Sequence, residues 1–246
     1  MAIVSVDCLP ESLGHQTTFQ AIIPEHRSEQ TRVLYLLHGL FGNDKQWLQS
    51  SSIALLAEGR DLAIIMPDTH RGYYTDMKFG AKYGTYLTQE LPEIVANIFA
   101  LRPDRSRTFI GGLSMGGYGA LKYGLSKPSQ YSKAFALSPA VDIARMRHES
   151  LEREQDFNLI FGSESDFEGS ENDLFHLLAI ADEKAMKGTA FLQICGVDDP
   201  FYSDNLRFKQ QFEQQSSSYI FKDRPGGHSW ELWNEEIVTS LNWLDH

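Results

Sequence analysis

The stretch FIGGLSMGGYGAL, from Phe109 to Leu121, constrains the fold of this chain more than any other part of the sequence. It places one serine among five glycines, at the point where an apolar run gives way to a helix-like pattern. A strand that turns sharply into a helix with a serine at its tip crowds the positions two before and two after that serine. Gly112 and Gly116 occupy these positions. The stretch therefore predicts a G-x-S-x-G nucleophile elbow at Ser114, and a glycine-rich turn without chemistry is the alternative.

Short apolar runs alternate with helical patterns along the rest of the chain. Strands are expected at 18–23, 33–38, 62–67, 108–114, 133–138, 190–195 and 218–223. Apolar residues at intervals of three and four predict helices over 87–98 and near the C-terminus over 230–244. This alternation is typical of an α/β fold in which helices flank a mostly parallel central sheet. With 246 residues, the chain is expected to form one domain over 1–246.

One segment, from about 139 to 173, interrupts the alternation. It is rich in charged residues, carries scattered aromatic side chains and lacks strand periodicity. Because the segment follows a strand, we expect an insertion over the carboxyl ends of the sheet, where doubly wound folds bind their ligands. Either a cap over the active site or a solvated loop with short helices fits this pattern.

Charge and cysteine content exclude several classes of partner. The chain has 33 acidic and 22 basic residues, a net charge of −11, which repels nucleic acid and anionic lipid. No run approaches the roughly 18 apolar residues of a membrane span, so we expect no membrane partner. Cys8 and Cys195 are too few for a disulfide framework. Together with an N-terminus that lacks the features of a secretory signal, they predict a cytoplasmic protein.

A serine hydroxyl needs a base that removes its proton and an acid that orients this base. His228, in the stretch RPGGHSWELW, follows the last expected strand and precedes the C-terminal helix. This place, in the chain order Ser, Asp, His, predicts that His228 is the base for Ser114, and an ordinary surface or core histidine is the alternative.

The acid is expected after the strand at 190–195. There the stretch GVDDPFYSDN contains Asp198, Asp199 and Asp204. Pro200 favours extended geometry at Asp199, which suits a carboxylate projecting from a strand end, but this argument does not decide between Asp198 and Asp199. An aspartate-rich turn or a weak cation site is the alternative. Because the regular ligand spacing of a calcium loop is missing, no metal site is expected.

Two backbone N–H groups are expected to form the oxyanion hole. The N–H of Met115 follows from its place at the start of the helix after Ser114. The second donor is expected in YLLHGLFGNDKQW, where Gly39 allows close approach and Leu40 supplies the N–H. His38 in the same loop is interpreted as structural, since His228 is better placed as a base.

Several ordered motifs together resemble the esterase D family of α/β-hydrolases, in the superfamily of S-formylglutathione hydrolases and feruloyl esterases. The motifs are VLYLLHGLFGNDKQW, MPDTHRGYYTD, ELPEIV, FIGGLSMGGYGAL, CGVDDPFYSDN and GGHSWELW. Within the family, the chain is most similar to small bacterial tributyrin esterases. The resemblance implies an α/β-hydrolase fold with Ser114 as nucleophile, His228 as base and Asp199, rather than Asp198, as acid. It also implies backbone donors at Leu40 and Met115 and no cofactor.

By this resemblance, we expect a serine carboxylesterase that hydrolyses short-chain acyl esters of small molecules through an acyl-serine intermediate. An S-formylglutathione thioesterase or a feruloyl or acetyl esterase is the alternative within the family. S-formylglutathione hydrolases resemble one another in a Ser-Gly-Leu-Thr-Cys stretch where this chain has HGLFGN. An acyltransferase and a non-catalytic binding protein on the same fold are alternatives of other classes. The aromatic residues of RGYYTDMKFGAKYGTYL fit a subunit contact, a pocket mouth or ordinary packing under the cap, so a homo-oligomer is one of the alternatives.

Overall fold

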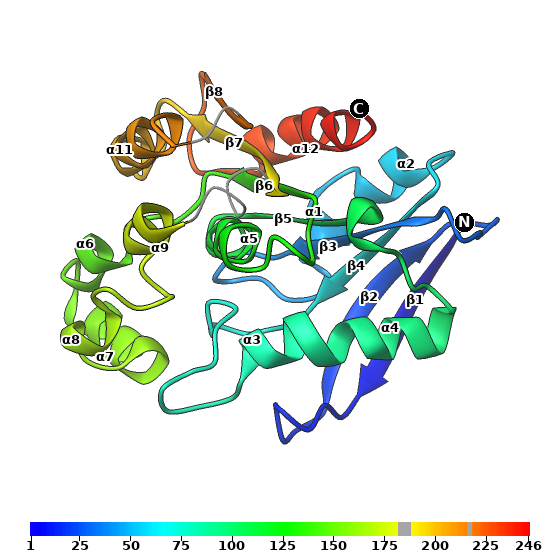
Figure 1. Cartoon of the computed structure of the whole chain (residues 1–246), viewed down its shortest axis with the longest axis horizontal. Coiled ribbons are helices and arrows are strands. Elements are labelled where there is room, and N and C mark those ends of the chain that lie inside the picture. The colour runs from blue at the N-terminus through cyan, green and yellow to red at the C-terminus, as the bar shows by residue number, and fades with distance from the viewer. Residues whose placement is uncertain (182–187, 216–217) are drawn as a thin grey trace.

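A single eight-stranded sheet forms the centre of the molecule (Figure 1). The computed structural model describes residues 1–181, 188–215 and 218–246. The strands are β1 (Ala2–Cys8), β2 (Thr17–Ile23), β3 (Arg32–Leu37), β4 (Leu62–Pro67), β5 (Thr108–Leu113), β6 (Lys133–Leu137), β7 (Ala190–Gly196) and β8 (Tyr219–Arg224). Their order is β1-β2-β4-β3-β5-β6-β7-β8, and β2 runs antiparallel to both of its neighbours while the pairs from β4 to β8 are parallel. The expected mostly parallel α/β architecture is confirmed.

The seven strands expected from the sequence are present, but β1 was not predicted. It pairs only with β2, at the edge of the sheet. Its residues alternate between exposed and half-buried positions, and Val4, Val6 and Cys8 are the ones that pack against the core. An edge strand with one solvated face has no need of the continuous apolar run that marks a central strand.

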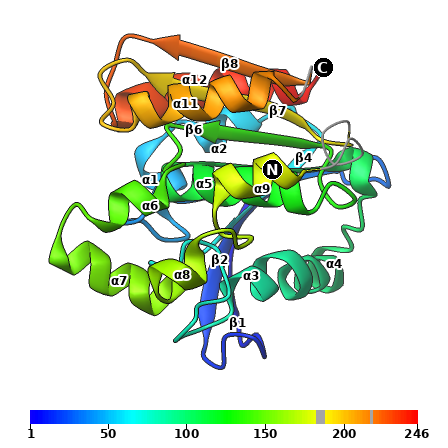
Figure 2. The same ribbon diagram turned by 60° about the vertical axis from the view of Figure 1, so that its left-hand side comes forward.

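Helices cover both faces of the sheet (Figures 1 and 2). They are α1 (Gln46–Ser50), α2 (Ile53–Ala57), α3 (Tyr83–Thr85), α4 (Leu91–Phe99), α5 (Met115–Ser126), α6 (Ile143–Arg147), α7 (Leu151–Phe161), α8 (Glu164–Phe167), α9 (Leu174–Ile180), α11 (Tyr202–Glu213) and α12 (Trp230–Leu244), with a π-helical turn η1 (Tyr86–Glu90) and a 3₁₀ turn η2 (Arg105–Arg107). Successive residues of β3 point to opposite faces: Val33 and Tyr35 join the core under α4 and α5, whereas Leu34 and Leu36 join the core under α2 and α12.

Both helices expected from apolar periodicity are present. The C-terminal one matches the bounds of α12. The other begins earlier than 87, because α3 and η1 lead without a break into α4. It ends at Ala100, whose left-handed φ of 55° stops the helix. Among the described residues, no helix is long and apolar enough to cross a membrane.

The expected insertion at 139–173 is helical. It contains α6, α7 and α8 and leads into α9, and these helices group together at one side of the molecule (Figures 1 and 2). Side-chain caps at Asp142, Ser150, Ser163 and Asp173 begin the four helices. Short capped helices carry less apolar periodicity than a long helix, which explains why the sequence pattern was weak here.

Candidate active site

Ser114 lies at the tip of a sharp turn between β5 and α5. Its backbone has φ 52° and ψ −114°, a conformation that residues with side chains rarely adopt. The surrounding chain holds it there, because the Ser114 N–H donates to the carbonyl of Leu137 at 2.8 Å and its own carbonyl accepts from Tyr118 at 2.9 Å. The local sequence therefore folds into the elbow that its glycines predict.

The glycines at this turn are required by close backbone contacts. A Cβ added to Gly112 would lie 2.7 Å from the carbonyl carbon of Gly116 and 2.7 Å from the carbonyl oxygen of Leu37. A Cβ added to Gly116 would lie 2.4 Å from the same oxygen. All three distances are far below van der Waals contact, so the end of β3, the end of β5 and the start of α5 can meet only where these residues lack side chains.

His228 lies within hydrogen-bonding distance of the serine. Its Nε2 is 2.9 Å from Oγ of Ser114, although 114 positions separate the two residues in the chain. The imidazole packs edge-on against Phe201 and Trp233, with ring centroids 5.0 Å and 4.8 Å away. These aromatic rings restrict the imidazole to an orientation that points Nε2 at the serine.

Asp199 completes a chain of hydrogen bonds. Its Oδ2 lies 2.8 Å from Nδ1 of His228, and its Oδ1 accepts from the Phe201 N–H at 2.8 Å. The side chain of Asp199 is fully buried. Asp198 lies elsewhere, where it accepts from the Gly226 N–H at 3.2 Å. Asp204 is also distant from the imidazole and pairs with Arg145 and Arg207.

Leu40 and Met115, the two expected oxyanion donors, flank Ser114 from different elements. Met115 is the first residue of α5, where backbone N–H groups have no acceptor within the helix. Leu40 follows β3 and, with Gly39, lines the same cavity as Ser114. A Cβ on Gly39 would lie 2.7 Å from Cδ1 of Leu113, so a side chain there would require the Leu113 side chain to move.

Four side chains that the sequence did not single out hold the Leu40 loop. Trp47 Nε1 donates to the Leu37 carbonyl at 3.0 Å, and Gln46 Oε1 accepts from the Gly39 N–H at 3.2 Å. The Tyr74 hydroxyl donates to the carbonyl of His38 at 2.9 Å. The fourth residue, Trp230, packs edge-on against Trp47 with ring centroids 5.2 Å apart. No spacing in the sequence distinguishes these residues from ordinary core positions.

His38 is buried and takes no part in the Ser114 hydrogen-bond chain. Its Nδ1 lies 2.7 Å from the carbonyl of Gly39, and its Nε2 accepts from the Thr69 N–H at 3.2 Å. Because a carbonyl needs a donor and an N–H needs an acceptor, the two contacts fit a neutral imidazole with its proton on Nδ1. The ring thus ties the Leu40 loop to the loop that follows β4.

The reactive groups open into a cavity of about 420 Å³. It is lined by Gly39, Leu40, Phe41, Gln46, Tyr73, Leu113, Ser114, Met146, Arg153, Phe201, His228, Trp230 and Trp233. Met146 and Arg153 come from the 139–173 segment, which therefore forms part of the cavity wall. Sequence reasoning missed most of the lining, because it is assembled from loops and helix starts that share no motif.

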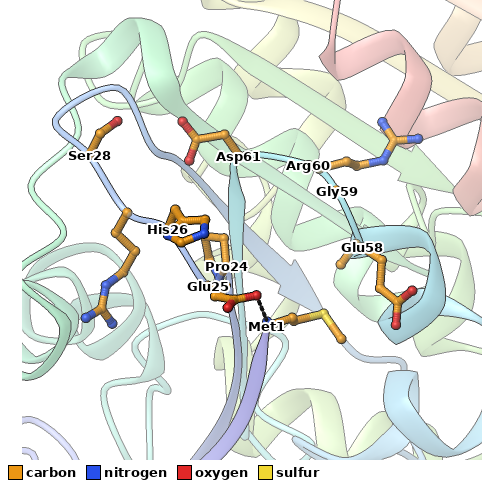
Figure 3. A pocket seen from close by; sticks show the side chains of 11 residues that line it. Met1, Pro24, Glu25, His26, Ser28, Glu58, Gly59, Arg60 and Asp61 are labelled. Carbon is orange, nitrogen blue, oxygen red and sulfur yellow. Dashed lines mark ion pairs between the residues drawn. The ribbon is translucent and has the colours of Figure 1, made fainter.

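A second hollow, of about 700 Å³, lies near the start of β4, beside Met1, Arg60 and Asp61 (Figure 3), whereas Ser114 follows the end of β5. Several of the charged groups around it pair with other parts of the chain. The N-terminal ammonium of Met1 is 3.8 Å from Glu25, and Arg60 bonds Asn242 at 2.7 Å and Asp245. Asp61 accepts from Thr31 at 2.6 Å. These contacts hold the chain together and do not assemble a nucleophile with a base.

Cys195 is a buried thiol in β7, the strand that leads to Asp199. Burial raises the pKa of the Cys195 thiol, so Cys195 is not a competing thiolate nucleophile. The described part of the chain contains no group of three or more His, Cys, Asp or Glu residues placed to hold a metal ion. The site as seen consists of Ser114, His228 and Asp199 with backbone donors nearby, an arrangement suited to acyl transfer through a serine ester.

Comparison with known families agrees with this geometry. The model of the Esterase family, described as "Putative esterase", matches residues 10–244. The acetyl esterase of Caldicellulosiruptor saccharolyticus is 28% identical over an alignment of 261 positions, which covers 99% of this chain and 98% of that protein.

Solved structures are similar over the whole chain. FphF, a fluorophosphonate-binding serine hydrolase of Staphylococcus aureus, matches with a TM-score of 0.90 and 29% identity, covering 100% of this chain and 98% of that one. An S-formylglutathione hydrolase of Staphylococcus aureus matches with a TM-score of 0.88 and 30% identity, covering 100% and 99%. The eight-stranded sheet with its flanking helices is therefore the α/β-hydrolase fold.

Proposed function

The chain belongs to the esterase family whose model matches residues 10–244 and is a serine carboxylic ester hydrolase, and on that premise we propose that Ser114, His228 and Asp199 are its catalytic triad. The observation that carries the proposal is the pair of contacts at His228, 2.9 Å to Ser114 Oγ and 2.8 Å to Asp199 Oδ2. The two contacts give the imidazole one acceptor nitrogen facing the serine and one N–H facing the carboxylate.

In the first half-reaction, Ser114 Oγ attacks the ester carbonyl while Nε2 of His228 takes its proton. The carbonyl oxygen gains negative charge, and the N–H groups of Leu40 and Met115 stabilise it. His228 then gives the proton to the leaving alcohol. The buried carboxylate of Asp199 stabilises the imidazolium that exists between these two transfers.

In the second half-reaction, water attacks the acyl-serine. His228 removes a proton from this water and later returns one to Ser114 Oγ, which releases the acid and restores the enzyme. No metal ion or cofactor takes part in either half-reaction as proposed. The strained backbone of Ser114 keeps Oγ exposed to both the substrate and the imidazole.

Short-chain acyl esters of small alcohols are the proposed substrates. The acetyl esterase that is 28% identical over nearly all of both chains supports this choice. The cavity volume of about 420 Å³ also lies towards the small end of the range, roughly 300 to 1,000 Å³, that is usual for ligand sites.

We further propose that the whole chain acts as one domain in which the 139–173 segment covers the substrate, supported by Met146 and Arg153 in the cavity wall. A cytoplasmic location remains a proposal, which the low cysteine content supports.

A panel of substrates tests the proposal, with the Ser114→Ala protein as the blank. Initial rates would be measured on p-nitrophenyl acetate, butyrate, octanoate and decanoate, on methyl ferulate and on S-formylglutathione. We expect the highest kcat/KM for acetate or butyrate, and a fall of about 10⁴-fold or more in kcat for Ser114→Ala. Equal activity of the two proteins would contradict the triad.

Thioester hydrolysis is the second candidate, because an S-formylglutathione hydrolase is 30% identical with a TM-score of 0.88. The same panel separates the two functions. A dominant rate on S-formylglutathione would replace the short-chain ester proposal and leave the triad unchanged, since both reactions pass through an acyl-serine.

A further inference from the structure

Arg153 places a positive charge in the wall of the cavity that holds Ser114. Of the residues that line this cavity, Arg153 is the one with a permanently charged side chain, and none of them is a carboxylate. The rest of the lining is apolar or aromatic apart from Gln46, Ser114 and His228. The protein as a whole has a net charge of −11, so a cation at this place is not explained by a generally basic surface.

The orientation of the guanidinium is set by its own helix. Arg153 lies in the first turn of α7, where its backbone N–H donates to the Ser150 hydroxyl at 3.1 Å. Its guanidinium carbon lies 5.7 Å from the centroid of the Phe157 ring, one turn further along α7. Phe157 in turn packs edge-on against Tyr73, another residue of the cavity wall, with centroids 5.3 Å apart. The Tyr73 hydroxyl also interacts with the Arg153 guanidinium. Because a guanidinium has five N–H donors and stacking does not use them, other N–H groups of Arg153 stay available to a ligand.

The charge of Arg153 is only partly matched by the protein. Its carboxylate neighbour is Glu149, at 3.8 Å, which is longer than the roughly 2.8 Å of a direct arginine–carboxylate hydrogen bond. Glu149 also pairs with Arg145, at the shorter distance of 3.0 Å. The side chain of Arg153 is 25% exposed, so it is accessible to a molecule in the cavity. A carboxylate there could accept two parallel N–H bonds from the planar guanidinium.

We propose that Arg153 selects esters that carry a carboxylate in addition to the ester group, so that this carboxylate binds the guanidinium while Ser114 attacks the ester carbonyl. The inference rests on the proposed function, because it concerns the substrate of that same site. The carboxylate can belong either to the acyl part, as in a monoester of a dicarboxylic acid, or to the alcohol part, as in an acylated hydroxy acid. Both sources present the same recognition chemistry to Arg153.

Matched substrate pairs measure the selectivity. For the acyl side, mono-p-nitrophenyl succinate is compared with p-nitrophenyl butyrate, and for the alcohol side 4-acetoxybenzoate is compared with 4-methylphenyl acetate. In at least one pair we expect the charged ester to have the higher kcat/KM. Arg153→Gln should lower the charged-to-neutral ratio about 10-fold or more, the effect of losing a charge-assisted hydrogen bond. Arg153→Lys should retain part of the ratio, since it keeps the charge and loses the planar fork.

Arg71→Gln is the matched control. Arg71 lies near the cavity, with its guanidinium 6.0 Å from the ring centroid of Phe41 in the cavity wall, but it pairs with Asp156 and is not itself a lining residue. The change removes the same charge and should leave the ratio unaltered. Equal ratios in wild type, Arg153→Gln and Arg71→Gln would overturn the inference, as would an equal loss in both variants, which would indicate a general field effect.

A binding measurement distinguishes failure of this inference from failure of the proposed function. Calorimetric titration of mono-p-nitrophenyl succinate into Ser114→Ala and into Ser114→Ala combined with Arg153→Gln needs no turnover. Tighter binding to the protein that keeps Arg153 supports the inference, whether or not any ester is hydrolysed. If this binding is seen and the wild type hydrolyses no ester, the proposed function alone is contradicted. Equal binding to both proteins, together with normal Ser114-dependent hydrolysis of p-nitrophenyl butyrate, would overturn the inference alone.

Discussion

Nδ1 of His228 lies 2.8 Å from Oδ2 of Asp199, while the adjacent carboxylate of Asp198 faces the Gly226 N–H instead. Two adjacent residues therefore have different partners: the carboxylate of Asp199 contacts the imidazole, and that of Asp198 accepts a hydrogen bond from the loop before His228. Gly196, at the end of β7, makes this arrangement possible, because a Cβ there would lie 2.1 Å from the carbonyl oxygen of Gly226.

Replacement of each aspartate should have very different consequences for activity. In Asp199→Asn, the amide can donate to Nδ1 and so favour the tautomer that carries its proton on Nε2, which cannot accept from Ser114. We expect kcat to fall by about 10⁴-fold with the fold intact. Asp198→Asn keeps an oxygen for the Gly226 N–H, so kcat should stay within about threefold of wild type. Steady-state kinetics on p-nitrophenyl acetate check both values, and the reverse order would assign the acid to Asp198.

Gly116→Ala should destabilise the protein, because the added methyl would lie 2.4 Å from the Leu37 carbonyl oxygen. The backbone atoms that it meets belong to the centre of the sheet and cannot move away. We expect the free energy of unfolding to fall by about 2 kcal/mol or more. Gly227→Ala is the control, since the nearest atom to its Cβ lies at 3.7 Å, and it should change stability by less than about 0.5 kcal/mol. Urea denaturation followed by tryptophan fluorescence gives both values.

Gln46→Met should lower kcat with little change in stability. The variant removes the oxygen that accepts the Gly39 N–H at 3.2 Å and so loosens the loop that carries Leu40. Loss of one hydrogen bond that orients an oxyanion donor is worth about 1 kcal/mol, or roughly a fivefold to tenfold loss in kcat. Gln49→Met, on the exposed side of the same short helix, should leave kcat unaltered. A similar loss in both variants would show that Gln46 acts only through α1.

The buried side chain of Lys122 should make the stability of the protein depend on pH. Its side chain is buried in α5, where Nζ bonds Thr75 Oγ1 at 2.9 Å and Asn172 Oδ1 at 2.6 Å, and burial lowers its pKa to about 8. An unfolded lysine titrates near its ordinary value of about 10.4. Between these values the folded protein has released the proton that the unfolded chain still binds. Stability should therefore rise with pH through this window.

The measurement compares wild type with Lys122→Met. The difference in the free energy of unfolding, wild type minus variant, should increase by about 1 to 2 kcal/mol from pH 7.5 to pH 9.5. Subtraction of the variant cancels the titration of other groups. The exposed Lys45→Met serves as control and should give a difference that does not change with pH. A flat difference for Lys122→Met would mean that its ammonium stays protonated over the whole range.

Much of the fold could be predicted from the sequence because its signals are local. The central strands are buried on both faces and read as continuous apolar runs, as in β4, where all six residues are buried. The elbow at Ser114 carries its own glycines, which the close contacts with Leu37 explain. The edge strand β1 lacks such a local signal, and the sequence pattern did not reveal it. For 139–173 the pattern allowed short helices but could not locate α6 to α8.

The sequence by itself determined the types of the proposed catalytic residues and their order along the chain, since Ser114 and His228 each lie in a local motif. Only the tertiary structure decided which carboxylate faces His228, because Asp198 and Asp199 are chemically identical neighbours and the twist of the chain after β7 selects between them. The same holds for the cavity wall, where Arg153, Gln46 and Trp230 come from three separate elements. Their proximity follows from how helices pack on the sheet, and no spacing along the chain encodes it.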